Sequence, residues 1–327
     1  MNKRTKSMLI GSGVPAAVMA LAGSARHSAA NYLVKVALDR KIPPHPIGME
    51  RRLAASCGDS EMLQKLQQAG AILKNLPHET VTLQSWDGTP LVGHWIPAKN
   101  PSRIIVAMHG WRSSWNRDFG IVADFFCKNN CSVLYAEQRG QGESGGQYMG
   151  FGLTERHDCL DWIQWANRRN PQGLPIYLCG VSMGASTVLM AADLPFPGNV
   201  RGIIADCGYT SAVDIWKHVV KQTHISYHFC GVPAGKMAKK RLQMNMDAVS
   251  CPQVLSHSHI PVLFVHGTDD RFVPIEMTYE NYKACAAPKR LFVVPGAKHG
   301  MSYLVEPVGY EAAIKSFWAE FDKNLST

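Results

Sequence analysis

Residues 175–192 read PIYLCGVSMGASTVLMAA, and this stretch decides the predicted fold. A short apolar run leads into GVSMG at residues 180–184, and a second apolar run follows it. The G-x-S-x-G spacing is typical of a serine on a tight strand-to-helix turn, where two glycines remove side chains that would collide with neighbouring backbone. We therefore predict that Ser182 is a nucleophile whose hydroxyl projects clear of the chain.

Short, continuous apolar runs alternate with amphipathic helical patterns on both sides of this motif. Such runs indicate strands that are covered on both faces, and their alternation with helices indicates a mostly parallel sheet. The sequence therefore predicts an α/β fold with helices on both faces of the sheet, after a hairpin in residues 81–96. The predicted strands are residues 103–108, 131–137, 175–180, 200–207, 261–266 and 290–295, and the predicted helices are residues 60–73, 119–128, 154–169, 183–192, 277–286 and 310–323.

Residues 210–259 form a connection far longer than is usual between two strands. Helical patterns at residues 212–222 and 236–242 indicate a helical lid insertion, and an insertion at the carboxyl ends of the strands is well placed to cover the Ser182 pocket. Cations outnumber anions in it, which favours a neutral or anionic acyl substrate or a membrane surface, although a solvated basic face explains them equally well. The charged residues noted are Lys217, Lys221, Lys236, Lys239, Lys240 and Arg241, against Asp214 and Asp247.

A serine nucleophile needs a base and an acid that orients the base. The segment PGAKHG at residues 295–300 follows the last predicted strand and supplies His299 as the base. The segment HGTDDRFVP at residues 266–274 follows the strand before it and offers two acids. Asp270 is the predicted acid, and Asp269 is the alternative. The resulting chain order of serine, acid and histidine is that of the α/β-hydrolases.

Two backbone N–H groups are predicted to stabilise the oxyanion. The first belongs to Met183, directly after the nucleophile. The second belongs to Trp111 in the segment His109-Gly110-Trp111, which follows the strand at residues 103–108. The side chain of His109 is expected to be structural rather than catalytic.

These motifs together resemble the α/β-hydrolase superfamily, in particular its bacterial branch related to serine aminopeptidases and prolyl-oligopeptidase-type hydrolases. The resemblance spans residues 81–324 in the family's motif order. It supports Asp270, because the family places the acid four residues after the histidine of its His-Gly pair, here His266. Glu137 departs conservatively from the aspartate usual in the family, and the segment at residues 151–162 is similar to a subgroup without a known substrate.

Composition limits the remaining functions. The 327 residues carry a formal net charge of +9 and include nine cysteines, without a CxxC pair. No basic run with interleaved aromatic residues indicates nucleic-acid binding, and no dinucleotide-binding loop is present. His224 and His228 have a spacing that could ligate a metal, but no third ligand is evident. We therefore predict no cofactor, no metal and no nucleic-acid partner, and buried free thiols for most cysteines.

The N-terminal residues carry the pattern of a signal peptide or membrane anchor. Lys3, Arg4 and Lys6 precede an apolar run at residues 8–22. Signal peptide, uncleaved anchor and plain N-terminal helix are all open alternatives, with export or membrane anchoring slightly favoured over the cytoplasm. The expected division is a signal- or anchor-like segment at residues 1–40, a helical arm at residues 41–78 and a catalytic domain at residues 79–327. A chain that begins near Lys74 is expected to keep its activity.

The sequence therefore predicts a serine hydrolase that cleaves carboxylic esters through an acyl-enzyme, with a small-molecule acyl substrate. A serine peptidase, such as an aminopeptidase, or an acyltransferase would use the same three residues. A non-catalytic binding module is disfavoured because the full set of Ser182, Asp270 and His299 is present. The acyl group, the leaving group and the oligomeric state are not predicted.

Overall fold

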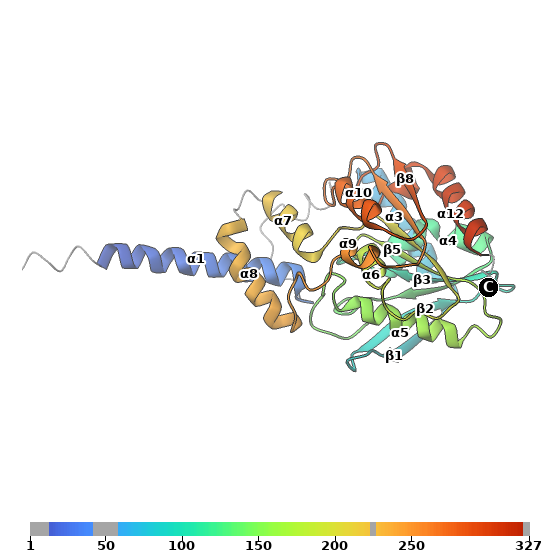
Figure 1. The fold of residues 1–327 in the computed structure, drawn as a ribbon, viewed down its shortest axis with the longest axis horizontal. Coiled ribbons are helices and arrows are strands. Elements are labelled where there is room, and N and C mark those ends of the chain that lie inside the picture. Colours follow the sequence, from blue (N-terminus) through green and yellow to red (C-terminus); the bar gives the residue numbers. More distant parts are fainter. Residues whose placement is uncertain (1–12, 42–57, 223–226, 323–327) are drawn as a thin grey trace, which may run out of the picture.

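The computed structural model describes residues 13–41, 58–222 and 227–322, in which an eight-stranded sheet lies between layers of helices (Figure 1). The strand order is β1-β2-β4-β3-β5-β6-β7-β8. β2 pairs antiparallel with β1 and β4, whereas the other pairings are parallel, so the predicted mostly parallel sheet is confirmed. The strands are β1 (Glu79–Gln84), β2 (Pro90–Ile96), β3 (Arg103–Met108), β4 (Cys131–Ala136), β5 (Ile176–Val181), β6 (Val200–Asp206), β7 (Val262–Gly267) and β8 (Lys289–Val294).

Helices occupy every segment in which helical spacing was predicted, although their ends differ from the predicted ends by up to four residues and α8 begins nine residues earlier. α9 and α11 were not predicted, because helices of five and four residues are too short to show a periodic pattern. The helices are α1 (Gly13–Leu38), α3 (Ser60–Asn75), α4 (Trp115–Lys128), α5 (Glu155–Arg168), α6 (Met183–Met190), α7 (Ala212–Gln222), α8 (Tyr227–Leu242), α9 (Cys251–Leu255), α10 (Ile275–Ala284), α11 (Ser302–Val305) and α12 (Pro307–Phe321).

The central strands bury both of their faces. Along β3, Ile104 and Val106 belong to a core cluster shared with α5 and α6, whereas Ile105 and Ala107 belong to a second cluster shared with α4 and α12. Successive side chains of a strand point to opposite faces. A strand between two helical layers therefore needs an apolar residue at every position, which explains the unbroken apolar runs in the sequence.

The insertion between β6 and β7 is helical, as predicted, and consists of α7, α8 and α9 with their connections. The predicted segment at residues 212–222 coincides with α7, and residues 236–242 are the second half of α8. α8 packs against α1, so the insertion and the N-terminal helix lie side by side at one end of the molecule (Figure 1).

The sequence set residues 1–40 apart from the catalytic domain as a signal- or anchor-like segment, but the end of the N-terminal helix α1 packs into the core of that domain. It extends from the body of the protein for much of its length (Figure 1), but Ala30, Val34 and Leu38 are fully buried in the core cluster that α5 and α6 share. Residues 30–38 are therefore integral to the folded unit, whereas the basic residues Lys3, Arg4 and Lys6 lie outside the described residues. In the described part of the chain, no helix combines the length and hydropathy needed to span a membrane.

The cysteines follow their predicted use. Eight of them lie in the described part of the chain, and no disulfide joins any two of these eight. Seven are buried and Cys127 is exposed, which agrees with their positions in apolar stretches.

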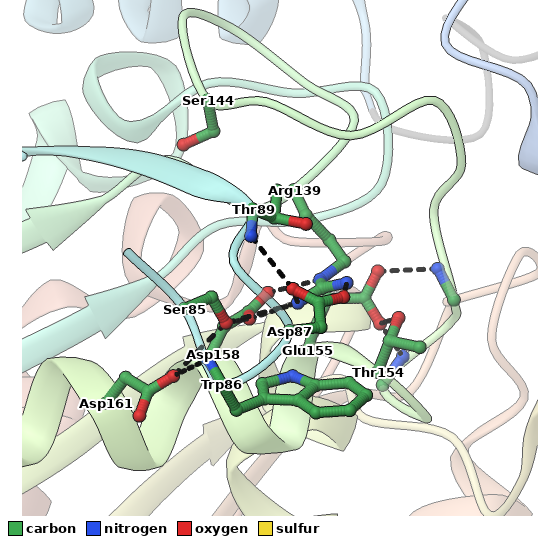
Figure 2. A network of polar contacts seen from close by, with 12 residues as sticks. Ser85, Trp86, Asp87, Thr89, Arg139, Ser144, Thr154, Glu155, Asp158 and Asp161 are labelled. Atoms are coloured by element: carbon green, nitrogen blue, oxygen red, sulfur yellow. Dashed lines mark hydrogen bonds and ion pairs between the residues drawn. The ribbon is translucent and has the colours of Figure 1, made fainter. Parts of the chain in front are cut away.

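A buried ionic network fastens the turn of the β1–β2 hairpin to α5 (Figure 2). Arg139 donates to the Asp158 carboxylate through Nε at 2.5 Å and contacts Asp87 through Nη1 at 2.7 Å. Ser85 donates a further hydrogen bond to Asp158. At the other end of the network, Glu155 accepts the N–H groups of residues 150 and 152, which closes the tight turn before α5. The network thus holds the long segment between β4 and α5.

Asp158→Asn is expected to destabilise the fold by about 3 kcal/mol, because the buried Arg139 guanidinium loses its principal counter-charge. Urea unfolding should show a lower midpoint with an unchanged slope. Asp161→Asn is the matched control, because Asp161 is partly exposed and accepts only from the Trp86 N–H and the Ser85 hydroxyl. An equal loss in both variants would show that the ion pair adds nothing beyond an ordinary hydrogen bond.

Candidate active site

The turn between β5 and α6 places Ser182 in a backbone conformation that L-residues rarely adopt. Its φ is 55° and its ψ is −117°. Backbone crowds this turn from two sides: a Cβ at position 184 would lie 1.8 Å from the Met108 carbonyl oxygen, and one at position 180 would lie 2.3 Å from the Gly184 oxygen. Glycine is therefore required at both positions of the G-x-S-x-G motif. Strain of this kind persists only where the surrounding structure enforces it.

The loops after β7 and β8 bring the other two predicted residues to Ser182. His299 Nε2 lies 2.9 Å from Ser182 Oγ, and His299 Nδ1 lies 2.6 Å from Asp270 Oδ2. With Nδ1–H donating to the carboxylate, Nε2 is free to accept the proton of the serine hydroxyl. The three side chains thus form one continuous hydrogen-bonded line across residues that are 117 positions apart in the sequence.

Of the two candidate acids, Asp270 faces His299. Its second oxygen, Oδ1, accepts the N–H groups of Phe272 and Val273, both at 2.9 Å, so the carboxylate has a fixed orientation. Asp269 is exposed, and its carboxylate accepts from the neighbouring Thr268 hydroxyl. The structure therefore places Asp270, and not Asp269, beside His299.

A second histidine also contacts this carboxylate. His266 Nε2 lies 3.2 Å from Asp270 Oδ2 and donates to the Val273 carbonyl oxygen at 2.9 Å. The hydrogen is therefore on Nε2, because both of its neighbours are acceptors, and Nδ1 lies 2.7 Å from the Thr278 hydroxyl, from which it can accept. The His-Gly pair was noted in the sequence, but this role for His266 was not predicted, because the sequence does not show which way the ring points.

The charges of the site favour an ionised acid and a strongly basic histidine. Burial opposes ionisation of Asp270, but the charge of His299 and hydrogen bonds from both histidines outweigh it and hold the pKa well below its usual range. Burial likewise opposes protonation of His299, but the Asp270 carboxylate outweighs it and raises the pKa above its ordinary value. The carboxylate therefore stabilises the imidazolium that forms when His299 takes a proton.

This shift predicts the pH dependence of the activity. Only neutral His299 can accept the Ser182 proton, so kcat/KM for an uncharged ester should rise with pH through the pKa of His299. That midpoint is expected above the ordinary histidine value of 6.5, because Asp270 raises it. A profile of kcat/KM against pH measures it directly. A midpoint at or below 6.5 would contradict the proposed coupling of the two residues.

The loop after β3 lies directly against the nucleophile. A Cβ at position 110 would lie 3.4 Å from Ser182 Cβ, so the chain passes the serine at close range. Asp118 holds this loop: it accepts the Gly110 N–H at 2.7 Å and the Ser113 hydroxyl at 2.5 Å. The predicted donor Trp111 lies between these two anchored residues.

Met183, the other predicted oxyanion donor, is the first residue of α6. The first N–H groups of a helix have no acceptor within the helix, and the helix dipole favours negative charge at this end. The sequence position of Met183 thus places a free donor directly beside Ser182.

His109 does not reach the reacting groups. Its Nδ1 donates to the Gly110 carbonyl oxygen at 2.8 Å, and its Nε2 accepts the Gln138 N–H at 3.1 Å. Burial lowers the pKa of His109, which keeps the ring neutral and suits it to this pair of hydrogen bonds. The structure therefore supports the expected structural use of this side chain.

An aromatic cluster lies between the base and the insertion. Its members are joined in a chain of ring contacts: His299 with Phe272 at 5.0 Å, Phe272 with Trp111 at 6.4 Å, Trp111 with Phe151 at 6.3 Å, and Phe151 with Trp216 at 5.9 Å. Because Trp216 belongs to α7, the cluster connects the insertion with the catalytic loops. α7 also contacts the loop after β7 that carries Asp270: Gln222 donates to the Arg271 carbonyl oxygen at 2.5 Å.

One group of possible metal ligands occurs in the described residues, and it includes two of the catalytic candidates. Cys207, Asp270 and His299 have ligand atoms within 4.8 Å of one another. Burial raises the pKa of the Cys207 thiol well above its ordinary value, so the sulfur stays protonated and is a poor ligand. Asp270 and His299 are already bonded to each other. His224 and the side chain of His228 lie outside the described residues.

Comparison with known proteins agrees with this architecture. A family model described as serine aminopeptidase, S33, matches residues 99–225. The uncharacterised protein YqkD of Bacillus subtilis is 27% identical over 229 residues, which cover 68% of this chain and 73% of YqkD.

Solved structures are similar in fold at low sequence identity. An esterase of Pyrococcus furiosus aligns with a TM-score of 0.62 and 21% identity, over 76% of this chain and 92% of the esterase. An acylaminoacyl peptidase of Pyrococcus horikoshii aligns with a TM-score of 0.58 and 16% identity, over 79% of this chain and 44% of the peptidase. Esterases and peptidases thus share this fold, and the fold alone does not select a substrate.

Proposed function

We propose that this chain, which has the α/β-hydrolase fold, is a hydrolase that cleaves carboxylic esters through an acyl-enzyme on Ser182. The observation that carries the proposal is the unbroken line from Ser182 Oγ through His299 to Asp270, with separations of 2.9 and 2.6 Å. Nucleophile, base and orienting acid within hydrogen-bond distance are the requirements of covalent acyl transfer.

The reaction proceeds in two halves on the same residues. Ser182 Oγ bonds to the ester carbonyl carbon while its proton passes to His299 Nε2, and the imidazolium then protonates the leaving alcohol. In the second half, His299 removes a proton from water, the hydroxide attacks the acyl carbon, and the proton returns to Ser182. In both halves the N–H groups of Trp111 and Met183 hold the negative carbonyl oxygen.

The proposed preference for esters over peptides rests on the scarcity of carboxylates in the insertion and on the aromatic side chains beside His299. An aminopeptidase needs carboxylates to hold a cationic amino terminus, and the insertion is poor in them. One of its acids, Asp214, accepts hydrogen bonds from the hydroxyls of Thr210 and Ser211 at the start of α7, so it is already engaged. The aromatic cluster beside His299 suits an apolar acyl group.

A direct comparison of substrates tests the proposal. The unmodified enzyme should hydrolyse p-nitrophenyl esters of graded acyl length with a higher kcat/KM than aminoacyl p-nitroanilides, measured at the same pH. Faster cleavage of the anilides would replace the esterase with a peptidase. Product esters formed when an alcohol is added, in place of free acid, would identify an acyltransferase.

The predicted role of the insertion is tested with two exposed lysines of α8. The double variant Lys239→Glu, Lys240→Glu should raise KM for an anionic ester and leave a neutral ester nearly unchanged, because only the anion is attracted by these charges. Arg241 is left intact, because the structure pairs it with Asp39 at 2.7 Å and its loss would disturb α1. Lys283→Glu on α10 is the exposed control. Equal effects on both esters would mean that the insertion does not select by charge.

A further inference from the structure

The end of α1 is in direct contact with the loop that carries the proposed oxyanion donor. The indole Nε1–H of Trp111 donates to the Ala37 carbonyl oxygen at 2.8 Å. Arg112 donates to the Val36 carbonyl oxygen through Nε at 3.0 Å and Nη2 at 2.7 Å, and to the Asp39 carbonyl oxygen through Nη2 at 2.7 Å. Two consecutive residues of the loop are thus bonded to one helix end.

These contacts stabilise both the end of α1 and the backbone of Arg112. The last carbonyl groups of a helix lack intrahelical donors, and a cation at this end is favoured by the helix dipole. The guanidinium of Arg112 meets both needs at the end of α1. In return, the helix holds Arg112 in a left-handed backbone conformation, with φ at 50°, which a non-glycine residue rarely adopts. The path of the loop at this point therefore depends on contacts outside the loop.

The end of α1 is itself anchored independently of this loop. Arg40 donates to the Gly142 carbonyl oxygen at 2.6 Å and to the Ser144 carbonyl oxygen at 2.5 Å. Asp39 pairs with Arg241 of α8, and the Met149 N–H donates to the carbonyl oxygen of residue 38 at 2.8 Å. Together with the buried side chains of residues 30, 34 and 38, these contacts make the helix end a firm support.

We propose that residues 30–40 are a positioning element of the oxyanion hole and that Arg112 is the positioning residue through which they act. Asp118 holds the loop on one side of Trp111 by its contacts with Gly110 and Ser113. The end of α1 holds it on the other side, so the Trp111 N–H keeps its direction toward the oxyanion. The expected change in kcat rests on the proposed function, whereas the support of the Trp111 loop by α1 does not. The proposal replaces the expectation that a chain beginning near Lys74 keeps its activity.

The principal variant is Arg112→Asn. Asparagine tolerates a positive φ better than most residues, so the backbone conformation stays accessible while the guanidinium is lost. A misdirected oxyanion donor should lower kcat for an ester by about 10- to 100-fold, with KM within about threefold, because the donor acts on the transition state more than on the bound ester. Affinity for a trifluoromethyl ketone, whose adduct carries an oxyanion, should fall in parallel. Arg112→Lys, which keeps the cation, should recover part of the loss.

Arg117→Asn is the matched control, because Arg117 is exposed on the helix that follows the same loop. It should keep kcat, KM and inhibitor affinity. Trp111→Phe is the second variant: it keeps an aromatic side chain and the backbone N–H, and it removes the bond to Ala37 together with part of the ring surface. It should lower kcat in the same direction by a smaller factor, and it carries the test if Arg112→Asn does not fold.

Amide hydrogen exchange of a peptide covering residues 109–114 measures the loop without any substrate. Exchange should accelerate in Arg112→Asn and Trp111→Phe and remain unchanged in Arg117→Asn. Unchanged exchange in Arg112→Asn and Trp111→Phe would overturn the proposal. Faster exchange together with an unchanged kcat would overturn it as well. If the unmodified enzyme hydrolyses no ester, the proposed function fails, whereas the exchange result still decides whether α1 positions the loop.

Discussion

Ser182→Ala is expected to abolish labelling by a fluorophosphonate probe and to lower ester hydrolysis by about 10⁴- to 10⁶-fold. The reason is that Ser182 presents its oxygen to His299 Nε2 at 2.9 Å, on a turn that projects it from the backbone, and that Asp270 in turn contacts this histidine. Residual activity would come from the remaining oxyanion donors acting on bound water and ester. Gel-based labelling and initial rates measure the two effects.

Ser186→Ala is the control for this experiment. Ser186 lies one helical turn further along α6 and is fully buried, but its hydroxyl bonds to the Tyr209 backbone. This variant should remain labelled if it folds. Labelling that survives Ser182→Ala would assign the nucleophile to another residue and would remove the basis of the proposed function.

Asp270→Asn is expected to lower kcat by about 10⁴-fold, because an amide in place of the carboxylate favours the wrong tautomer of His299 and no longer stabilises its cation. Asp269→Asn should change kcat by less than about threefold, since the Asp269 carboxylate is exposed and bonds only locally. Steady-state kinetics on the same ester compare the neighbours directly. The opposite ranking would move the acid by one residue and would contradict the observed contact at 2.6 Å.

The fold could be predicted well because its signals are local. Apolar runs identified β3 through β8: β3 to β7 are buried on both faces, whereas the edge strand β8 is mostly half-buried. The turn at Ser182 could be identified because its backbone crowding leaves room only for glycine at positions 180 and 184. The chain order of serine, acid and histidine then indicated which loops meet.

The roles of particular side chains were harder to predict, because they depend on direction. Asp269 and Asp270 are adjacent and chemically identical, and only the turn that gives Asp270 two backbone N–H donors directs it toward His299. His266 was part of a noted motif, but its contact with Asp270 depends on the orientation of its ring, which lies between Thr278 and Val273. Neither orientation has a signature in the order of residues.

The N-terminal helix shows the difference between what the sequence determines by itself and what only the tertiary structure decides. By itself, the sequence determined that residues 8–22 are apolar and follow basic residues, that the chain folds as an α/β sheet, and that Ser182, the adjacent acids Asp269 and Asp270, and His299 follow in the order serine, acid, histidine. Only the tertiary structure decided that the end of α1 belongs to the core and supports the loop of Trp111. Strand and helix patterns follow from neighbouring residues, whereas the bond between Arg112 and Val36 joins groups 76 positions apart. Such a contact exists only once packing has brought both segments to the same edge of the sheet.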